Sequence, residues 1–236
     1  MTTIDAGQPI DAVLFDFHST LVDQGDASQW LADAWRRTGR TNHPSDPLDQ
    51  GGLGPHAHRE LTAYLHRVWE HSHTHDPDNH RDRDTTTHRA VWNATMTAQP
   101  HGDPELFDAL YASMLDQWLP YEDTLPTLQS LRDAGIRTAV LSNVGIDLTP
   151  VLRRTGIADA VDAVVMSYQV GSAKPEPQIF RHTLDLLDVS AERALMAGDS
   201  WRDDSGAAAV GIRTLLLPRT VTPAHGLGLV LRLVGR

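Results

Sequence analysis

Cysteine is absent from the chain, and its absence excludes three kinds of chemistry. Without thiols, the protein has no disulfides, no thiolate nucleophile and no cysteine-ligated zinc site. Catalysis would therefore have to use oxygen and nitrogen groups. Apolar residues make up 40% of the 236 positions, which is enough for one large domain or for a core domain that carries a smaller insert.

Basic residues are scarce as well. The chain has 20 Lys and Arg against 31 Asp and Glu, which gives a formal net charge of −11. Nucleic acids and anionic membranes normally bind a basic surface, so we expect neither as a partner. The chain also lacks an apolar run of about 18 residues and a basic leader followed by an apolar stretch. These absences predict a cytoplasmic protein, monomeric or homodimeric, that binds a small molecule.

Short apolar runs alternate with amphipathic segments along much of the chain. Residues 12–17, AVLFDF, predict a strand buried on both faces of a parallel sheet, with Asp16 at its C-terminal end. This strand is followed, from residue 125 on, by predicted helices at 125–134, 147–155, 177–187 and 206–210 and predicted strands at 136–142, 161–166, 194–198 and 213–217. The alternation predicts an α/β fold with a doubly wound parallel sheet, in which ligands bind beyond the carboxyl ends of the strands.

The intervening part of the chain has a different pattern. Apolar residues recur at helical spacing around residues 61–69 and 107–114, which indicates amphipathic helices. We therefore predict that residues 1–23 and 119–236 form the core domain and that residues 24–118 form an inserted helical cap domain.

Histidines are concentrated in this predicted cap. Ten of the 13 lie between His43 and His101. Four of them invite the hypothesis of a zinc or nickel site, namely His71, His73, His75 and His80. The residues around them are polar and turn-rich, which is more typical of a solvated loop, and we favour that interpretation.

Polar groups at the predicted strand ends form four motifs in a fixed order. They lie at Asp16–Thr20, Ser142–Asn143, Lys174 and Asp199–Asp204. This pattern resembles the haloacid dehalogenase (HAD) superfamily. The first motif reads DFHSTL, where the family has Asp-x-Asp-Gly-Thr, and the others read VLSN, AKPEPQIF and GDSWRDDSGA. The resemblance covers the core nearly end to end, and the cap only in its position and helical character.

The resemblance implies a magnesium-dependent hydrolase with a Rossmann-like core and a C1-type cap. Asp16 would attack the phosphorus of a small phosphate ester and form an aspartyl-phosphate, which divides one hard substitution into two easier ones. Because the carboxylate and the phosphate repel each other, Mg²⁺ would be needed between them. The resemblance assigns its ligands to Asp16, the backbone carbonyl of His18 and Asp199.

The resemblance also assigns supporting roles. Lys174 would neutralise charge on the nucleophile and on the transferred phosphoryl group. The hydroxyl of Ser142 and the backbone N–H of Asn143 would bind the substrate phosphate. The longer family spacing selects Asp204 as the last acid of the metal site, where it would hold a metal-bound water or Lys174 in place, and the adjacent Asp203 is the alternative.

Position 18 departs from the family pattern, because phosphatases of this family have an aspartate there that exchanges protons with the leaving group and with water. Imidazole, with an unperturbed pKa of about 6.5, is a competent acid or base near neutral pH. Three outcomes are open: a phosphatase that uses His18, a slow enzyme restricted to good leaving groups, or an inactive binding protein. Ser19 is a second departure, since the family has glycine there, which frees the backbone.

Other branches of the superfamily also vary position 18. A dehalogenase would need no metal, whereas this chain keeps the acidic fourth motif. A phosphonate-cleaving enzyme would need a Schiff-base lysine in the cap, but Lys174 is the only lysine in the sequence. We therefore expect a phosphatase, with a phosphate- or partner-binding protein and a carbon–halogen hydrolase as the alternatives.

Overall fold

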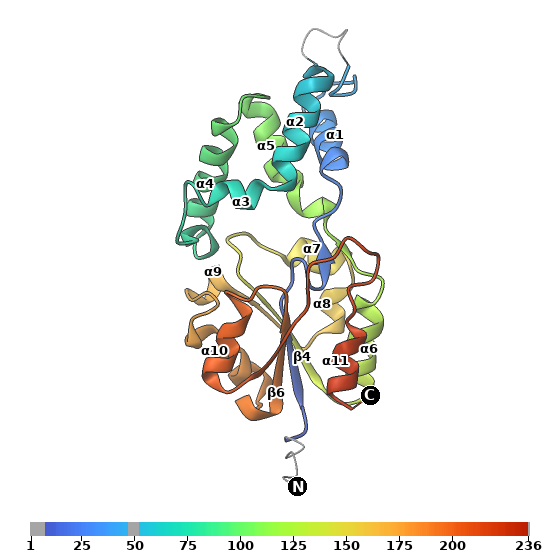
Figure 1. The fold of residues 1–236 in the computed structure, drawn as a ribbon, viewed down its shortest axis with the longest axis vertical. Helices are drawn as coiled ribbons and strands as arrows, with labels where there is room; N and C mark the ends of the chain where they lie inside the picture. Colours follow the sequence, from blue (N-terminus) through green and yellow to red (C-terminus); the bar gives the residue numbers. More distant parts are fainter. Residues whose placement is uncertain (1–7, 47–51, 236) are drawn as a thin grey trace. The chain divides into compact units, whose positions relative to one another are not determined.

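The computed structural model describes residues 8–46 and 52–235. The chain divides into two compact units (Figure 1). The first consists of Met1–Asp23 and Pro120–Arg236 and is called the α/β unit here. The second is Gln24–Leu119 and is called the helical unit.

The α/β unit is built around a five-stranded sheet. The strand order is β5-β4-β1-β6-β7, and the four pairs of neighbouring strands are parallel. The strands are β1 Ala12–Phe15, β4 Arg137–Ser142, β5 Ala163–Met166, β6 Ala194–Gly198 and β7 Arg213–Leu216. This topology confirms the predicted fold class, a doubly wound parallel sheet.

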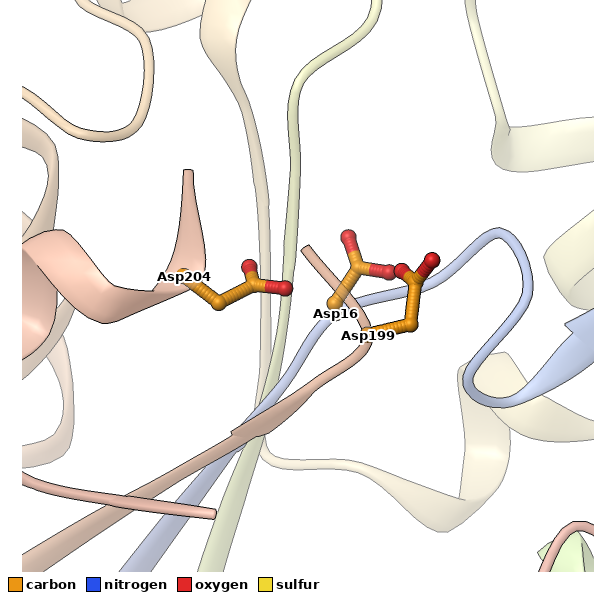
Figure 2. Close-up of side chains that lie close together, drawn as sticks. All are labelled: Asp16, Asp199 and Asp204. Atoms are coloured by element: carbon orange, nitrogen blue, oxygen red, sulfur yellow. The ribbon is translucent and has the colours of Figure 1, made fainter. Parts of the chain in front are cut away.

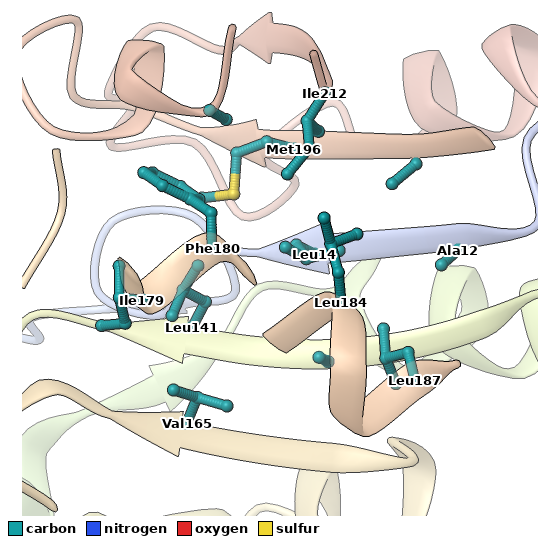
Figure 3. Close-up of a cluster of buried hydrophobic side chains, with 13 residues drawn as sticks. Ala12, Leu14, Leu141, Val165, Ile179, Phe180, Leu184, Leu187, Met196 and Ile212 are labelled. Atoms are coloured by element: carbon teal, nitrogen blue, oxygen red, sulfur yellow. The ribbon is translucent and has the colours of Figure 1, made fainter. Parts of the chain in front are cut away.

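Alternating side chains of the central strands pack on opposite faces of the sheet. On one face, Leu14 of β1, Leu141 of β4 and Met196 of β6 lie in a cluster with Phe180 and Leu184 of helix α10 (Figure 3). The four residues of β1 are buried, as expected for a strand covered on both faces.

Helices cover both sides of this sheet (Figure 1). They are α6 Thr124–Asp133, α7 Thr149–Arg154, α8 Ile157–Ala160, α9 Ser167–Val170, α10 Pro177–Leu187 and α11 Gly228–Leu233, with 3₁₀ helices η3 Ala191–Arg193 and η4 Asp204–Val210. Several predicted bounds need correction. The strand expected at 161–166 begins at Ala163, and the helix expected at 147–155 runs from Thr149 to Arg154. The helix expected at 206–210 is a 3₁₀ helix that begins at Asp204, and β1 ends at Phe15 rather than at Phe17, so that Asp16 is the first residue after the strand.

The helical unit contains short helices joined by turns. They are α1 Ala27–Arg37, α2 Gly54–His66, α3 Val68–Ser72, α4 Thr85–Ala98 and α5 Pro104–Ser113, with 3₁₀ helices η1 His80–Asp82 and η2 Met114–Gln117. Asp26 caps α1 by accepting the backbone N–H of Ser28 at 2.7 Å. The chain enters and leaves the helical unit through the short strands β2 Val22–Asp23 and β3 Leu119–Pro120, which pair with each other. In neither unit does a helix among the described residues combine the length and the apolar character that a bilayer crossing requires.

The histidine-rich segment at residues 71–88 combines exposed turns, as predicted, with a few buried polar side chains that were not expected. Asp76 and Arg81 are buried and form an ion pair, and the Asp76 carboxylate also accepts the backbone N–H of His80 at 2.8 Å. His88 is buried, with its Nδ1 2.9 Å from the hydroxyl of Tyr111. The exposed His73, His75 and His80 agree with the predicted solvated loop. Asp76, Arg81 and His88 depart from it, because each has a polar partner that offsets the cost of its burial.

Within the described ranges, the histidines considered for zinc or nickel do not meet as a group of metal ligands. Among the residues that the structure describes, the one group of three acids or histidines close enough to share an ion consists of Asp16, Asp199 and Asp204. His71 instead stacks on Tyr64, with ring centroids 4.1 Å apart.

Candidate active site

Two aspartates come together because they follow neighbouring parallel strands. Phe15 of β1 is paired with Ala197 of β6, so Asp16 and Asp199 emerge at the same carboxyl edge of the sheet. With Asp204 they contribute three carboxylate oxygens that lie within 4.8 Å of one another. The carboxylates of Asp16 and Asp199 lie side by side, and that of Asp204 is directed toward Asp16 (Figure 2).

Lys174 joins two of these acids. Its side chain is buried, and Nζ donates to Oδ1 of Asp16 and to Oδ1 of Asp204, both at 2.7 Å. The side chain of Asn143 holds the lysine backbone: Nδ2 donates to the carbonyl of Lys174, and the N–H of Lys174 donates to Oδ1, both at 2.8 Å. Asn143 therefore positions the lysine, a role that the sequence did not reveal. Ser142 is buried at the end of β4.

Of the two adjacent acids in the fourth motif, the structure places Asp204 in the cluster. Asp204 is fully buried, and its Oδ2 accepts the backbone N–H of Ser200 at 2.9 Å. Asp203 instead accepts the Ser200 hydroxyl at 2.7 Å. A Cβ atom on Gly198 would overlap the carboxylate of Asp204, so only glycine leaves this acid its place beside β6.

Burial and mutual charge shape the titration of this group. Burial raises the pKa of Asp16, which Lys174 opposes and Asp199 reinforces. Burial also raises the pKa of Asp204, again opposed by Lys174. For Lys174, burial favours the neutral amine, but Asp16 and Asp204 outweigh it and hold the pKa above its usual range. A charged ammonium is thus shared by two carboxylates with a third beside them.

The two departures from the family motif lie next to each other. Burial, followed by the charge of Arg219, lowers the pKa of His18 to about 4. Its ring Nδ1 is 3.3 Å from the hydroxyl of Ser19. Ser19 has a φ of +66°, the left-handed conformation that favours glycine, and its N–H donates to the carbonyl of Val22 at 2.8 Å. The turn after Asp16 therefore has a backbone conformation suited to glycine although serine occupies it.

Two side chains at this site were missing from the predicted set. The hydroxyl of Thr20 donates to Oδ2 of Asp16 at 3.1 Å, and Nε of Arg219 donates to Oδ2 of Asp199. Thr20 could have been inferred from its place in the first motif. Arg219 could have been inferred from topology, because it comes three residues after β7, the strand that neighbours β6.

The donor set fits the implied cation. Magnesium prefers hard oxygen ligands, and the cluster offers three carboxylates at one edge of the sheet. These carboxylates outnumber the single ammonium of Lys174 that two of them share. A divalent cation would offset the remaining negative charge.

Comparison with known proteins agrees with this geometry. The family model for haloacid dehalogenase-like hydrolases matches residues 10–211. The chain belongs to this family. This match confirms the predicted superfamily.

Curated relatives of the HAD-like chain include phosphatases and a dehalogenase. It is 33% identical to the ribulose-1,5-bisphosphate 5-phosphatase of Halopiger xanaduensis over 54% of each chain. It is 36% identical to the glyceraldehyde 3-phosphate phosphatase of Methanopyrus kandleri over 42% of this chain and 44% of the relative. It is 32% identical to (S)-2-haloacid dehalogenase 1 of a Pseudomonas strain over 44% of this chain and 46% of the relative. The chain thus spans about half the length of these relatives or less.

Solved structures share the fold over nearly the whole chain. A 2-haloacid dehalogenase from Pseudomonas syringae has a TM-score of 0.61 at 23% identity, over 96% of this chain and 99% of that one. A HAD phosphatase from Thermococcus onnurineus has a TM-score of 0.57 at 23% identity, over 92% of this chain and 90% of that one. At such identity these likenesses show the fold alone.

Proposed function

We propose that this HAD-like hydrolase is a magnesium-dependent phosphatase of small phosphorylated metabolites, with Asp16 as the nucleophile. The observation that carries the proposal is the buried cluster in which Lys174 joins Asp16 to Asp204, with Asp199 beside them. Perturbed, closely packed ionisable groups at the carboxyl edge of a parallel sheet are typical of a catalytic site.

The proposed reaction has two steps. A carboxylate oxygen of Asp16 attacks phosphorus, the bond from phosphorus to the leaving oxygen breaks, and that oxygen takes up a proton. Water then attacks the phosphorus of the aspartyl-phosphate, loses a proton and releases inorganic phosphate, which restores Asp16. His18 is the proposed partner in these proton transfers.

Other side chains hold the nucleophile and offset charge. The ammonium of Lys174 and the hydroxyl of Thr20 fix the two oxygens of Asp16, and Lys174 also neutralises the incoming phosphate. Ser142 and the backbone N–H of Asn143 are the proposed phosphate donors. Mg²⁺, when bound, would be held by Asp16, Asp199 and the carbonyl of His18, with Asp204 as the supporting acid, and would neutralise charge on nucleophile and phosphate.

The substrate class and the domain roles belong to the same proposal. The names of two relatives, a ribulose-1,5-bisphosphate 5-phosphatase and a glyceraldehyde 3-phosphate phosphatase, support a small organic phosphate as substrate. We assign residues 24–118 as the cap domain and residues 1–23 and 119–236 as the catalytic core.

The test is hydrolysis of p-nitrophenyl phosphate with Mg²⁺. Asp16→Asn should lower kcat by at least about 10³-fold, because an amide is a poor nucleophile. The matched control is Asp203→Asn, which makes the same change in the fourth motif at an acid that is bonded to Ser200, outside the cluster. An Asp16→Asn protein that is as active as the parent would show that the nucleophile is assigned wrongly.

The role of His18 needs a separate measurement. His18→Asp should move a limb of the kcat–pH profile, because the burial that lowers the pKa of the imidazole to about 4 would raise the pKa of a carboxyl group above its ordinary value. Since the parent has an imidazole where the family has a carboxylic acid, we expect a larger ratio of aryl to alkyl phosphate hydrolysis in the parent than in the variant. Identical profiles and identical ratios would rule out proton transfer by His18.

A carbon–halogen hydrolase is the second candidate, favoured by the likeness to (S)-2-haloacid dehalogenase 1. It predicts halide release from a 2-haloacid with no added metal. Phosphate and magnesium binding without turnover of either substrate would instead indicate a binding protein.

A further inference from the structure

Asp199, a proposed metal ligand, carries an ion pair with Arg219. Nε of Arg219 donates to Oδ2 of Asp199, whose side chain is only 3% exposed, whereas that of Arg219 is 69% exposed. A buried carboxylate without a compensating cation is costly, so this pair stabilises the cluster when no metal is bound.

The backbone that follows Arg219 is fixed to the start of α6. The N–H of Glu122 donates to the carbonyl of Pro223 at 2.8 Å. The carboxylate of Asp123 accepts three successive backbone N–H groups at 2.8–2.9 Å, those of His225, Gly226 and Leu227. The loop therefore holds the arginine near Asp199, while the exposed guanidinium has solvent into which it can move.

Charge counting separates the two cations of the site. Three carboxylates, those of Asp16, Asp199 and Asp204, face one ammonium and one guanidinium, which leaves a single negative charge. The side chain of Lys174 is 2% exposed and bonded to two acids, so moving it out of the site would leave both carboxylates without a cation. Arg219 makes its contact from the solvent side, and it is the cation that can be exchanged.

We propose that Arg219 and the divalent cation compete for Asp199, so that Arg219 sets the metal affinity of the site. The guanidinium leaves the carboxylate when the metal binds and returns when the metal dissociates. The inference rests on the proposed metal-dependent function, which it deepens. Because Arg219 is largely exposed, the pair should be of modest strength, and its loss should tighten metal binding about three- to fivefold.

The experiment is titration of Mg²⁺ into the purified, chelator-treated full chain by isothermal calorimetry, with Tm measured with and without Mg²⁺. Arg219→Gln removes the charge and should bind Mg²⁺ more tightly, while its metal-free Tm falls. Arg219→Lys keeps a cation and should stay closer to the parent. The matched control is Arg202→Gln, which makes the same charge change at an exposed arginine that stacks on Trp201 in the loop after Asp199. Its Mg²⁺ affinity should change less than about twofold.

The outcomes separate the two proposals. If the parent and Asp199→Asn both fail to bind Mg²⁺, the metal-dependent function itself is wrong. If the parent binds, Asp199→Asn does not, and Arg219→Gln binds no more tightly than the parent, competition by Arg219 is overturned. Equal tightening in Arg219→Gln and Arg202→Gln would also overturn it, because the effect would then come from net charge. Should Arg219→Gln fail to fold, Arg219→Met also removes the charge and should likewise bind Mg²⁺ more tightly than the parent; an unchanged affinity would overturn the exchange.

Discussion

Both units of the molecule bury charged side chains, but they balance those charges differently. In the helical unit, Arg81 lies 3.3 Å from the buried Asp76 and, less closely, 3.9 Å from the partly exposed Asp82, and backbone N–H groups satisfy the rest of the Asp76 carboxylate. In the α/β unit, Asp16 and Asp204 share the single ammonium of Lys174. In the first arrangement the one buried acid has a base at its side, whereas in the second two buried acids share a single base.

Excess buried acid is destabilising on its own, so its presence calls for a purpose other than stability. Burial raises the pKa of both Asp16 and Asp204, which is the sign of that cost. Burial also opposes the ionised form of Asp76, but bonds to the backbone of Arg81 and His80 and the Arg81 charge lower its pKa below the ordinary value. Chemistry is therefore expected in the α/β unit, and structural support from the Asp76 pair.

We expect the largest effects from removing the base of each arrangement, Lys174 in the α/β unit and Arg81 in the helical unit. Lys174→Met should lower kcat by roughly 10³-fold or more, because the nucleophile loses its partner and the phosphate loses a compensating charge. Arg81→Met should leave kcat within about twofold. Each variant should lose on the order of 3–5 kcal/mol of unfolding free energy, since each leaves a buried acid without its base.

Urea denaturation and kcat for p-nitrophenyl phosphate, measured on folded protein at low temperature, check both effects. If Lys174→Met retains the kcat of the parent, the catalytic role of Lys174 is wrong. If Arg81→Met lowers kcat as much as Lys174→Met does, the purely structural role of the Asp76 pair is wrong.

The next largest expected effect is a loss of stability at low pH, which comes from the buried imidazole of His88 in the helical unit. Burial, and then the charge of Arg81, lowers the pKa of His88 from 6.5 to about 4. Between these values the unfolded chain binds more protons than the folded one, so stability is present in full above pH 6.5 and is lost as the pH falls toward 4. The loss should be on the order of 3 kcal/mol.

Urea midpoints at pH 7, 5.5 and 4.5 measure this loss, with the tryptophans near His88, Trp69 and Trp92, as fluorescent reporters of the helical unit. His88→Gln is the control and should show a shallower dependence on pH. Equal slopes for the parent and the variant would mean that His88 does not stay neutral in the fold.

Ser19→Gly should have the smallest effect. Glycine adopts the observed φ of +66° without strain, but it also gives the unfolded chain more freedom. We expect a net gain of roughly 0.5–1 kcal/mol in unfolding free energy, measured as a small rise in the urea midpoint. A loss of stability would indicate that the contact between the Ser19 hydroxyl and His18 matters more than backbone strain.

The sequence predicted the elements whose pattern is local. The helix Pro177–Leu187 and the strand Ala194–Gly198 have the predicted bounds, because apolar spacing marks both elements, proline marks the start of the helix and glycine the end of the strand. Parallel topology then brings Asp16 and Asp199 to the same edge.

Side-chain direction was not predictable in this way. The amide of Asn143 bonds to the backbone of Lys174, 31 residues away, and Arg219 reaches Asp199 from the loop after β7, the neighbouring strand. The buried pair of Asp76 and Arg81 lies in a segment whose composition is typical of a solvated loop. Such contacts depend on tertiary packing, which composition and spacing do not encode.

The central claim is that a divalent cation binds to Asp16 and Asp199 beside Lys174. Lys174 is the only lysine of the chain, so protein labelled with ¹³C-lysine should give one set of lysine side-chain NMR signals. Titration with paramagnetic Mn²⁺ should broaden that signal beyond detection in the parent, and Asp199→Asn should keep it sharp at the same Mn²⁺ concentration. A lysine signal that stays sharp in the parent when Mn²⁺ is bound would contradict the account.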